Sequence, residues 1–113
     1  MNRLDRVTSL LKKEISDIII HKINDTRIGL VSITHIDISP DLRNAKVYYS
    51  VFGDEDTIKK TKSGLQSASK FIKGELGKVL QFQFVPHIRY IYDNSLEKGS
   101  DIVNKIASLN NDD

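Results

Sequence analysis

The chain has 113 residues, of which 39% are hydrophobic and 28% are charged, with a formal net charge of +2 and no cysteine. This length and composition indicate one globular domain with a core of its own. The absence of cysteine excludes disulfides, thiolate metal sites and cysteine nucleophiles. No apolar run approaches the roughly 20 residues that span a bilayer, and the charged N-terminus is unlike a secretory signal peptide. We therefore expect a cytoplasmic protein with no membrane partner.

The first half of the chain predicts one helix followed by two strands. Residues 3–23 place apolar side chains at helical spacing, and residues 25–29 interrupt that pattern as a turn. Residues 31–38 and 44–52 alternate apolar and polar side chains and are rich in β-branched types, which is typical of strands. The turn around Pro40 favours an antiparallel hairpin between them.

The second half predicts helix, strand and helix. Residues 55–80 read as helical with a weak centre at Ser67-Ala68-Ser69. Residues 83–92 read as a third strand, and Pro86 favours an edge position or a bulge there because proline donates no hydrogen bond. A last helix is expected over 96–109. In the first strand, a shift in the apolar phase after Ile33 indicates a β-bulge.

The predicted order is therefore α-β-β-α-α-β followed by a C-terminal helix. This order indicates a single α+β domain over residues 1–110, with helices on one face of a small sheet. Residues 111–113 are expected to be a disordered tail.

No residue pattern supports catalysis. His21, His35 and His87 fall on different predicted elements and share no metal-ligand spacing, so scattered structural histidines are the favoured interpretation. The chain has neither a phosphate-binding glycine loop nor a nucleophile elbow. Asp54 and Asp56 lie at a predicted helix start, where they favour the helix dipole. We expect no catalytic residue, no metal and no cofactor.

Positive charge is concentrated between residues 57 and 80. This segment carries six lysines against one acidic residue, a net charge of +5. Such a patch can attract a polyanion such as RNA although the whole chain is nearly neutral. The alternative is an ordinary solvated lysine face. The candidate lysines are Lys59, Lys60, Lys62, Lys70, Lys73 and Lys78.

Residues 74–77 spell G-x-x-G, the backbone clamp of KH nucleic-acid modules. An apolar helical stripe from Phe71 to Leu80 runs through this segment, so we interpret it as helix with a core face and a lysine–glycine face. The bare glycines would let a phosphate backbone approach closely, and the alternative is two tolerated glycines with no partner. The predicted lysine–glycine face consists of Lys70, Lys73, Gly74, Gly77 and Lys78.

The helix–helix junction is then expected upstream, where short hydroxyl side chains favour a bend. We expect Ala68 to be buried at this structural kink. Ser67, Ser69 and the N-terminus of the second helix would form a phosphate-binding corner together with the lysines.

Several separate motifs resemble the ribosome-binding factor A family over about residues 3–109. They are RVTSLLKKEISDII, Asp25-x-Arg27-Ile28-Gly29, ISPDLRNAKVYYSV, LQSASKFIKGELGK and VPHIRYIYDNSLEKG. The resemblance implies a type II KH-like fold in which an alanine-centred helix–kink–helix replaces the G-x-x-G loop. The family motif at the kink is A-x-G, and this chain has Ala68-Ser69-Lys70, with lysine in place of the glycine.

The resemblance also implies a function. Members of the family bind the free small (30S) ribosomal subunit without catalysing a reaction, assist late maturation of the 5′ end of 16S rRNA, and support growth in the cold. The expected partners are therefore the small subunit and its 16S rRNA, bound by a monomer. Arg43 and Lys46 of the second strand are further candidates for contacting RNA.

Two other functions remain open from the residues. A generic KH-like module would bind messenger or small RNA and would select short single-stranded oligonucleotides. A small α+β enzyme could act on phosphorylated substrates through the lysine corner, but the chain offers it no evident nucleophile or base.

Overall fold

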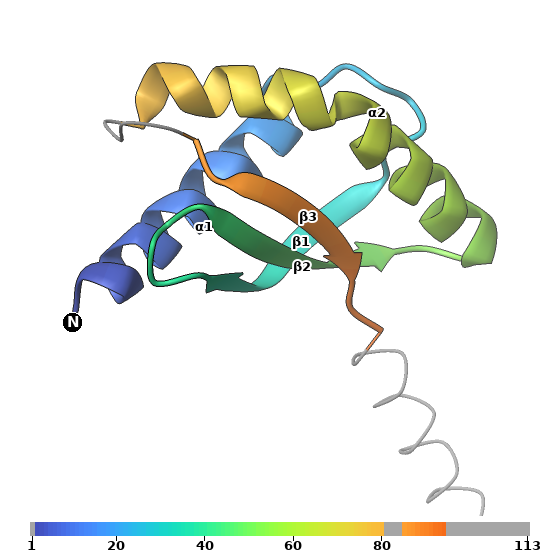
Figure 1. Cartoon of the computed structure of the whole chain (residues 1–113). Helices are drawn as coiled ribbons and strands as arrows, with labels where there is room; N and C mark the ends of the chain where they lie inside the picture. The colour runs from blue at the N-terminus through green and yellow to red at the C-terminus, as the bar shows by residue number, and fades with distance from the viewer. Residues whose placement is uncertain (1, 81–84, 95–113) are drawn as a thin grey trace, which may run out of the picture.

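A computed structural model describes residues 2–80 and 85–94. Over these residues the chain forms two helices and a three-stranded sheet, which confirms the predicted α+β class (Figure 1). The predicted C-terminal helix over 96–109 and the predicted tail over 111–113 lie outside the described residues. The elements, in chain order, are α1 (Arg3–His21), β1 (Leu30–Ile38), β2 (Asn44–Phe52), α2 (Glu55–Val79) and β3 (His87–Tyr92).

Helix α1 begins with a capping box. The Asn2 side chain accepts a hydrogen bond from the Asp5 backbone N–H at 2.8 Å, and the Asp5 carboxylate accepts one from the Asn2 backbone N–H at 3.4 Å. The helix ends at His21, two residues before the predicted end. Its apolar stripe is buried as predicted, through Val7, Leu11, Ile15, Ile18 and Ile19.

Strands β1 and β2 form the predicted antiparallel hairpin. Their register shifts between Ile33 and His35, which confirms the predicted bulge and places the extra residue at Thr34. The Thr34 hydroxyl donates toward the Tyr48 backbone oxygen at 3.2 Å and the Asp93 carboxylate at 3.0 Å, so the bulge contacts the end of the third strand as well.

Strand β3 pairs in parallel with β2 and lies at an edge of the sheet, which has the order β1-β2-β3. This confirms the edge position that Pro86 predicts. The strand begins at His87, directly after the proline, and not at residue 83 as predicted. A strand that starts after its proline keeps every backbone N–H that the ladder needs.

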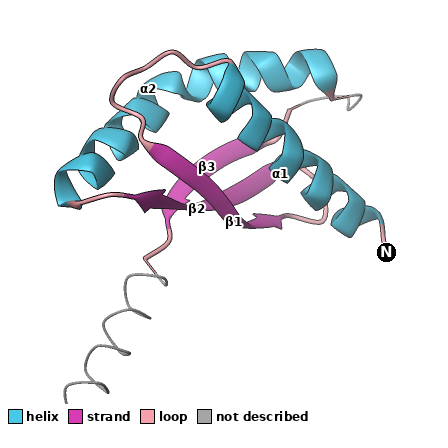
Figure 2. Cartoon of the chain, turned by 180° about the vertical axis from the view of Figure 1, so that it is seen from behind, coloured by secondary structure: helices cyan, strands magenta, loops and turns pink. Residues whose placement is uncertain are grey.

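The two helices form one layer and the strands the other (Figure 2). Apolar side chains from both layers meet in one core between them. The largest fully buried members come mainly from the helices and the central strand: Leu11, Ile15, Ile18, Val47, Leu65, Ile72 and Leu76.

The segment predicted as two helices is a single continuous helix of 25 residues. Its ribbon changes direction about halfway along, so the predicted bend occurs within one helix (Figure 1). The described order is therefore α-β-β-α-β, which fits a KH-like fold with its two central helices joined end to end. Helical hydrogen bonds tolerate such curvature because solvent-side bonds lengthen only slightly.

The loop before β1 lies directly on α2 at Gly64. A Cβ built on Gly64 would come within 2.6 Å of Ile28 Cγ1 and 3.4 Å of Arg27 Cβ. The Gly29 backbone N–H donates to the hydroxyl of Thr61, which is fully buried, at 3.0 Å. Because only hydrogen fits between Gly64 and the loop, this glycine sets how closely the loop packs against the helix.

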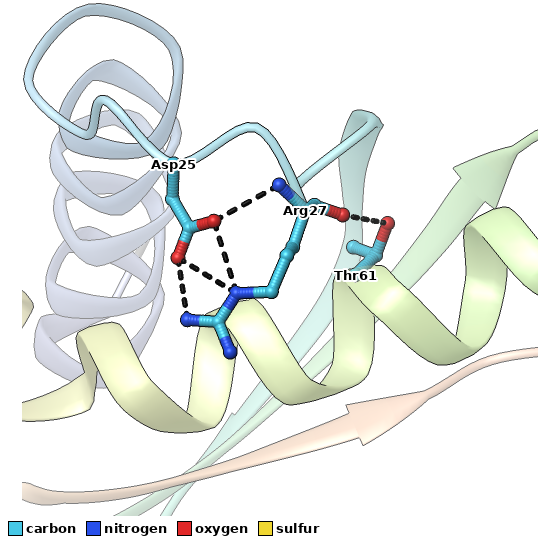
Figure 3. A network of polar contacts seen from close by, with 3 residues as sticks. All are labelled: Asp25, Arg27 and Thr61. Carbon is cyan, nitrogen blue, oxygen red and sulfur yellow. Dashed lines mark hydrogen bonds and ion pairs between the residues drawn. The ribbon is translucent and has the colours of Figure 1, made fainter.

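Asp25 and Arg27 hold the same loop in shape (Figure 3). The Arg27 side chain donates to both Asp25 oxygens, at 2.7 Å from Nη2 and at 3.1 and 3.2 Å from Nε. The Thr61 hydroxyl lies 3.4 Å from the Arg27 backbone oxygen. The hydrogen bonds from Arg27 lower the pKa of the Asp25 carboxyl below its usual value. The loop at 25–29 is therefore held against α2 by these contacts.

Replacing Asp54 with asparagine is expected to reduce the acid sensitivity of the fold. Asp54 caps α2 by accepting from the Thr57 backbone N–H at 2.8 Å and the Thr57 hydroxyl at 2.7 Å, which lowers the Asp54 pKa. A lowered carboxyl pKa stabilises the fold above about pH 4, and this contribution is lost as the pH falls through the folded-state pKa. Asparagine also caps helices well but does not titrate.

The measurement is the thermal midpoint at pH 7 and pH 3 for the wild type and for Asp54→Asn. Between pH 7 and pH 3, the thermal midpoint of the wild type should fall further than that of the variant. Because all other carboxyls are common to both chains, the difference between them isolates Asp54. Equal losses would show that the cap contributes nothing to the pH dependence.

Candidate nucleic-acid interface

All six candidate lysines of α2 are exposed. Two of them have carboxylate partners on the same helix. Lys60 lies 2.9 Å from Asp56, and Lys78 lies 3.1 Å from Glu75. Within residues 2–80 and 85–94, the lysines of this set without an ion pair are Lys59, Lys62, Lys70 and Lys73.

Glu75 pairs with a lysine of the predicted lysine–glycine face. It accepts from Lys78 and from Lys22 at the end of α1, at 3.1 and 3.3 Å, and these bonds lower the pKa of the Glu75 carboxyl. The carboxylate therefore stays ionised and offsets the charge of Lys78. Lys59 has no ion pair but lines neither of the hollows described next, so we centre the candidate site on Lys62, Lys70 and Lys73.

Those three lysines border two adjoining hollows between α2 and β3, which runs beneath the helix in Figure 1. The larger has a volume of about 600 Å³ and the smaller about 200 Å³. We call the two together the α2–β3 groove. The larger is lined by Tyr49, Lys62, Gln66, Ser69, Ile88, Arg89, Tyr90, Ile91 and Tyr92. The smaller is lined by Ser69, Lys70, Lys73, Pro86, His87, Ile88 and Tyr90.

Three tyrosines line the groove, of which Tyr49 is buried and Tyr90 and Tyr92 are half-buried. Tyr49 and Tyr92 meet edge to face with ring centroids 5.9 Å apart, and Lys62 Nζ lies 4.8 Å from the centre of the Tyr92 ring. Burial raises the pKa of the Tyr49 and Tyr90 phenols. Both phenols are therefore neutral at physiological pH and place no negative charge beside the lysines.

Ser69 is the only one of the two predicted serines that lines the groove. It borders both hollows, whereas Ser67 is exposed and lines neither. Ala68 was predicted to be buried, but it is only half-buried, packed against the core. Because α2 stays helical through this position, Ala68 is not enclosed between two separate helices. A phosphate contact by the Ser69 hydroxyl stays a prediction.

The helix does run through Gly74 and Gly77, as predicted, and no clamp loop forms. The apolar stripe predicted for this part is partly wrong, because Phe71 and Val79 are 45% and 42% exposed. Gly74 is open, with nothing within 4 Å of a built Cβ, while a Cβ on Gly77 would lie 3.6 Å from Val85. Both glycines are exposed, and Gly74 is the more open of the two.

Arg43 and Lys46 lie apart from α2. Lys46 points away from the helices on β2, and Arg43 lies in the hairpin turn with its Nε 3.9 Å from Asp41. Lys59 and Lys60, near the start of α2, line neither hollow. A single surface therefore does not unite all the residues that the sequence singled out.

The sequence did not predict that β3 contributes residues to the groove. Its inward-facing residues Ile88, Tyr90 and Tyr92 alternate with His87, Arg89 and Ile91, which is the period-2 signal of a strand. That alternation shows which side chains share a face. It does not show which helix the face will meet, because the parallel pairing with β2 is a long-range contact.

A profile of the family described as ribosome-binding factor A matches residues 3–106. The chain belongs to the ribosome-binding factor A family. It is 44% identical over 112 residues to ribosome-binding factor A of Dictyoglomus thermophilum, covering 98% of this chain and 93% of the relative. It is 46% identical over 100 residues to that of Halothermothrix orenii, covering 88% and 82%.

Solved structures of the family share the fold. The crystal structure of ribosome-binding factor A from Thermus thermophilus matches with a TM-score of 0.70 at 18% identity, covering 80% of this chain and 96% of that one. A homology model of the Thermus thermophilus factor, fitted into a cryo-EM map of a 30S complex, matches with a TM-score of 0.61 at 18% identity, covering 77% and 91%.

Proposed function

We propose that this protein is a non-enzymatic assembly factor that binds the free small ribosomal subunit. It assists late maturation of the 5′ end of 16S rRNA and supports growth in the cold. It acts in the cytoplasm as a monomer. The observation that carries this proposal is the family match over residues 3–106, and the 30S complex described for the Thermus thermophilus factor supports the choice of subunit.

The α2–β3 groove supplies the chemistry that such binding needs. Lys62, Lys70 and Lys73 lie along one edge and can each neutralise an RNA phosphate. The half-buried rings of Tyr90 and Tyr92 can contact sugars or unstacked bases. The groove therefore combines a sequence-independent attraction for the RNA backbone with a shape that selects an irregular RNA surface.

The role is binding and not catalysis. Among the described residues, no three histidine, cysteine or acidic side chains gather into a possible metal site. His21, His35 and His87 lie on three different elements. Binding alone can assist maturation, because a protein that favours one RNA conformation shifts the population toward it. None of the described helices is both long enough and apolar enough to cross a membrane.

A generic KH-like module for messenger or small RNA is the alternative. The tyrosine-lined hollow of about 600 Å³ favours it, because such a hollow can accept unstacked bases. The two functions predict different competition results. An assembly factor stays bound to the small ribosomal subunit in the presence of excess short RNA. A generic module is displaced from the subunit by oligonucleotides of its preferred sequence.

The proposed function is tested in cells from which the gene has been deleted. Primer extension across the 5′ end of 16S rRNA should show accumulated precursor, and growth should be impaired more in the cold. The wild-type gene should restore both, while Lys62→Gln with Lys70→Gln and Lys73→Gln should restore neither. Lys12→Gln with Lys13→Gln, on exposed positions of α1, is the control and should restore both. Normal 5′ ends in the deletion strain would overturn the role in maturation.

A further inference from the structure

The face of the sheet opposite the helices is open in the described part of the chain. Alternate residues of β2 are buried toward the helices, and the residues between them point away. The register places Tyr48 beside His35 of β1 and Ile91 of β3, and it places Lys46 beside Asp37 and Arg89. We call the set made by Lys46, Tyr48, His35, Arg89, Ile91 and Phe52 the outer sheet face. Arg89 and Ile91 belong to the edge strand β3 and also border the larger hollow of the groove.

Aromatic rings occupy the middle and one end of the outer sheet face. The rings of His35 and Tyr48 lie side by side, with centroids 5.7 Å apart and planes inclined by 37°. Phe52 is 80% exposed, and its cross-strand partner Leu30 is 69% exposed. A solvated face of an antiparallel sheet is normally polar, so ring surface of this extent indicates a surface built for contact.

The other end of the outer sheet face is cationic. Lys46 and Arg89 are exposed neighbours on β2 and β3, and neither has an ion pair among residues 2–80 and 85–94. The acidic residue of this region, Asp37, lies 2.6 Å from His35 Nε2, so its carboxylate already has a partner. Lys46 and Tyr48 are two residues apart, which separates them by roughly 7 Å along the strand.

We propose that the outer sheet face is a second RNA-binding surface, which takes an unpaired RNA segment. One base stacks on Tyr48 beside His35, while Lys46 and Arg89 contact the adjoining phosphates. Exposed aromatic side chains on a sheet bind single-stranded RNA in this way in other folds, because every base has a ring face and a flanking phosphate. The inference rests on the proposed function in taking RNA as the ligand. It adds a surface on the opposite side of the sheet from the α2–β3 groove, so that one molecule can hold two RNA segments.

The first test maps the contact on the wild-type chain. ¹⁵N-labelled protein is titrated with decauridylate, a single-stranded RNA without secondary structure, and amide shifts are followed by NMR. The proposal predicts that the amides of His35, Lys46 and Tyr48, none of which lines the α2–β3 groove, shift early in the titration. Shifts confined to α2 and the groove, or no binding of decauridylate, would overturn it.

The second test separates stacking from charge. Tyr48→Leu removes the ring but keeps an apolar side chain, and it should weaken decauridylate binding by about 5- to 150-fold, the range for loss of one stacked base. Tyr48→Phe keeps the ring and should bind within about twofold of wild type. Lys46→Gln should weaken binding and reduce its salt dependence, whereas Lys13→Gln on α1 makes the same charge change and should do neither. Equal binding by the Leu and Phe variants would rule out stacking.

Subunit binding is measured on the same preparations. If wild type co-sediments with small subunits but does not bind decauridylate on this face, the inference fails and the proposed function stands. If wild type binds decauridylate here but does not co-sediment, the proposed function fails and the RNA surface stands.

Discussion

Gly64→Ala is expected to destabilise the fold relative to the same substitution at Gly74. Both glycines lie in α2, so alanine gains up to about 1 kcal/mol of helix propensity at either position. At Gly64 the new methyl would lie 2.6 Å from Ile28 Cγ1, whereas at Gly74 it meets nothing within 4 Å. Overpacking costs about 1–3 kcal/mol, and the free energies of unfolding of the two variants should differ by that amount.

The two variants control for each other, because the chemical change and the helix are the same. For a domain of this size, each kcal/mol shifts the thermal midpoint by roughly 4–8 °C. Gly74→Ala should melt above wild type, and Gly64→Ala should melt well below Gly74→Ala. Equal thermal midpoints would show that Ile28 can move aside without destabilising the fold. Gly64 would then not be required for the close packing of the loop against α2.

Binding to the small subunit is expected to depend strongly on salt and on three lysines. Four lysines of α2 lack an ion pair in the described part of the chain. If each contacts one phosphate, the slope of about −0.7 to −0.9 per contact predicts a loss of about 50- to 150-fold between 50 and 200 mM salt. Lys62→Gln with Lys70→Gln and Lys73→Gln should reduce the contribution of α2 to about threefold over that range, with weaker binding at low salt, while the contacts proposed for Lys46 and Arg89 keep their own salt dependence.

The triple variant should keep its fold, since exposed substitutions of this kind usually change stability by no more than about 0.5 kcal/mol each. Lys12→Gln with Lys13→Gln removes two lysine charges from α1, against three removed from α2 by the triple variant, and should bind like wild type. Lys78→Gln is a second control, because Glu75 already pairs with Lys78. A folded triple variant that retains the wild-type salt slope would exclude the groove as the RNA contact.

Local patterns in the sequence were sufficient to predict most of the helices and strands. The stripe of α1, the hairpin around Pro40 and the bulge after Ile33 each depend on residues close together in the chain. Pro86 alone likewise indicates an edge strand, because proline has no backbone N–H to donate to a neighbouring strand. These features are confirmed because local periodicity and backbone chemistry determine them.

The candidate site depends on contacts that no local pattern contains. The importance of Gly64 comes from the loop at 25–29, more than 30 positions earlier in the chain, and its neighbours in sequence give no sign of that contact. The weak centre at Ser67-Ala68-Ser69 predicts a bend correctly, but it cannot distinguish a bent helix from two helices. The pairing of Lys78 with Glu75 and Lys22 likewise depends on how α1 meets α2.

Co-sedimentation of the purified wild-type chain with purified ribosomal particles tests the central claim most directly. The protein is mixed at low salt with 30S subunits, 50S subunits or 70S ribosomes and separated on sucrose gradients. We expect it in the 30S fractions, in amounts that fall steeply as salt is raised and that excess decauridylate does not abolish. A chain that stays at the top of all three gradients, or that distributes equally among the three particles, would contradict the assignment of this protein as a small-subunit factor.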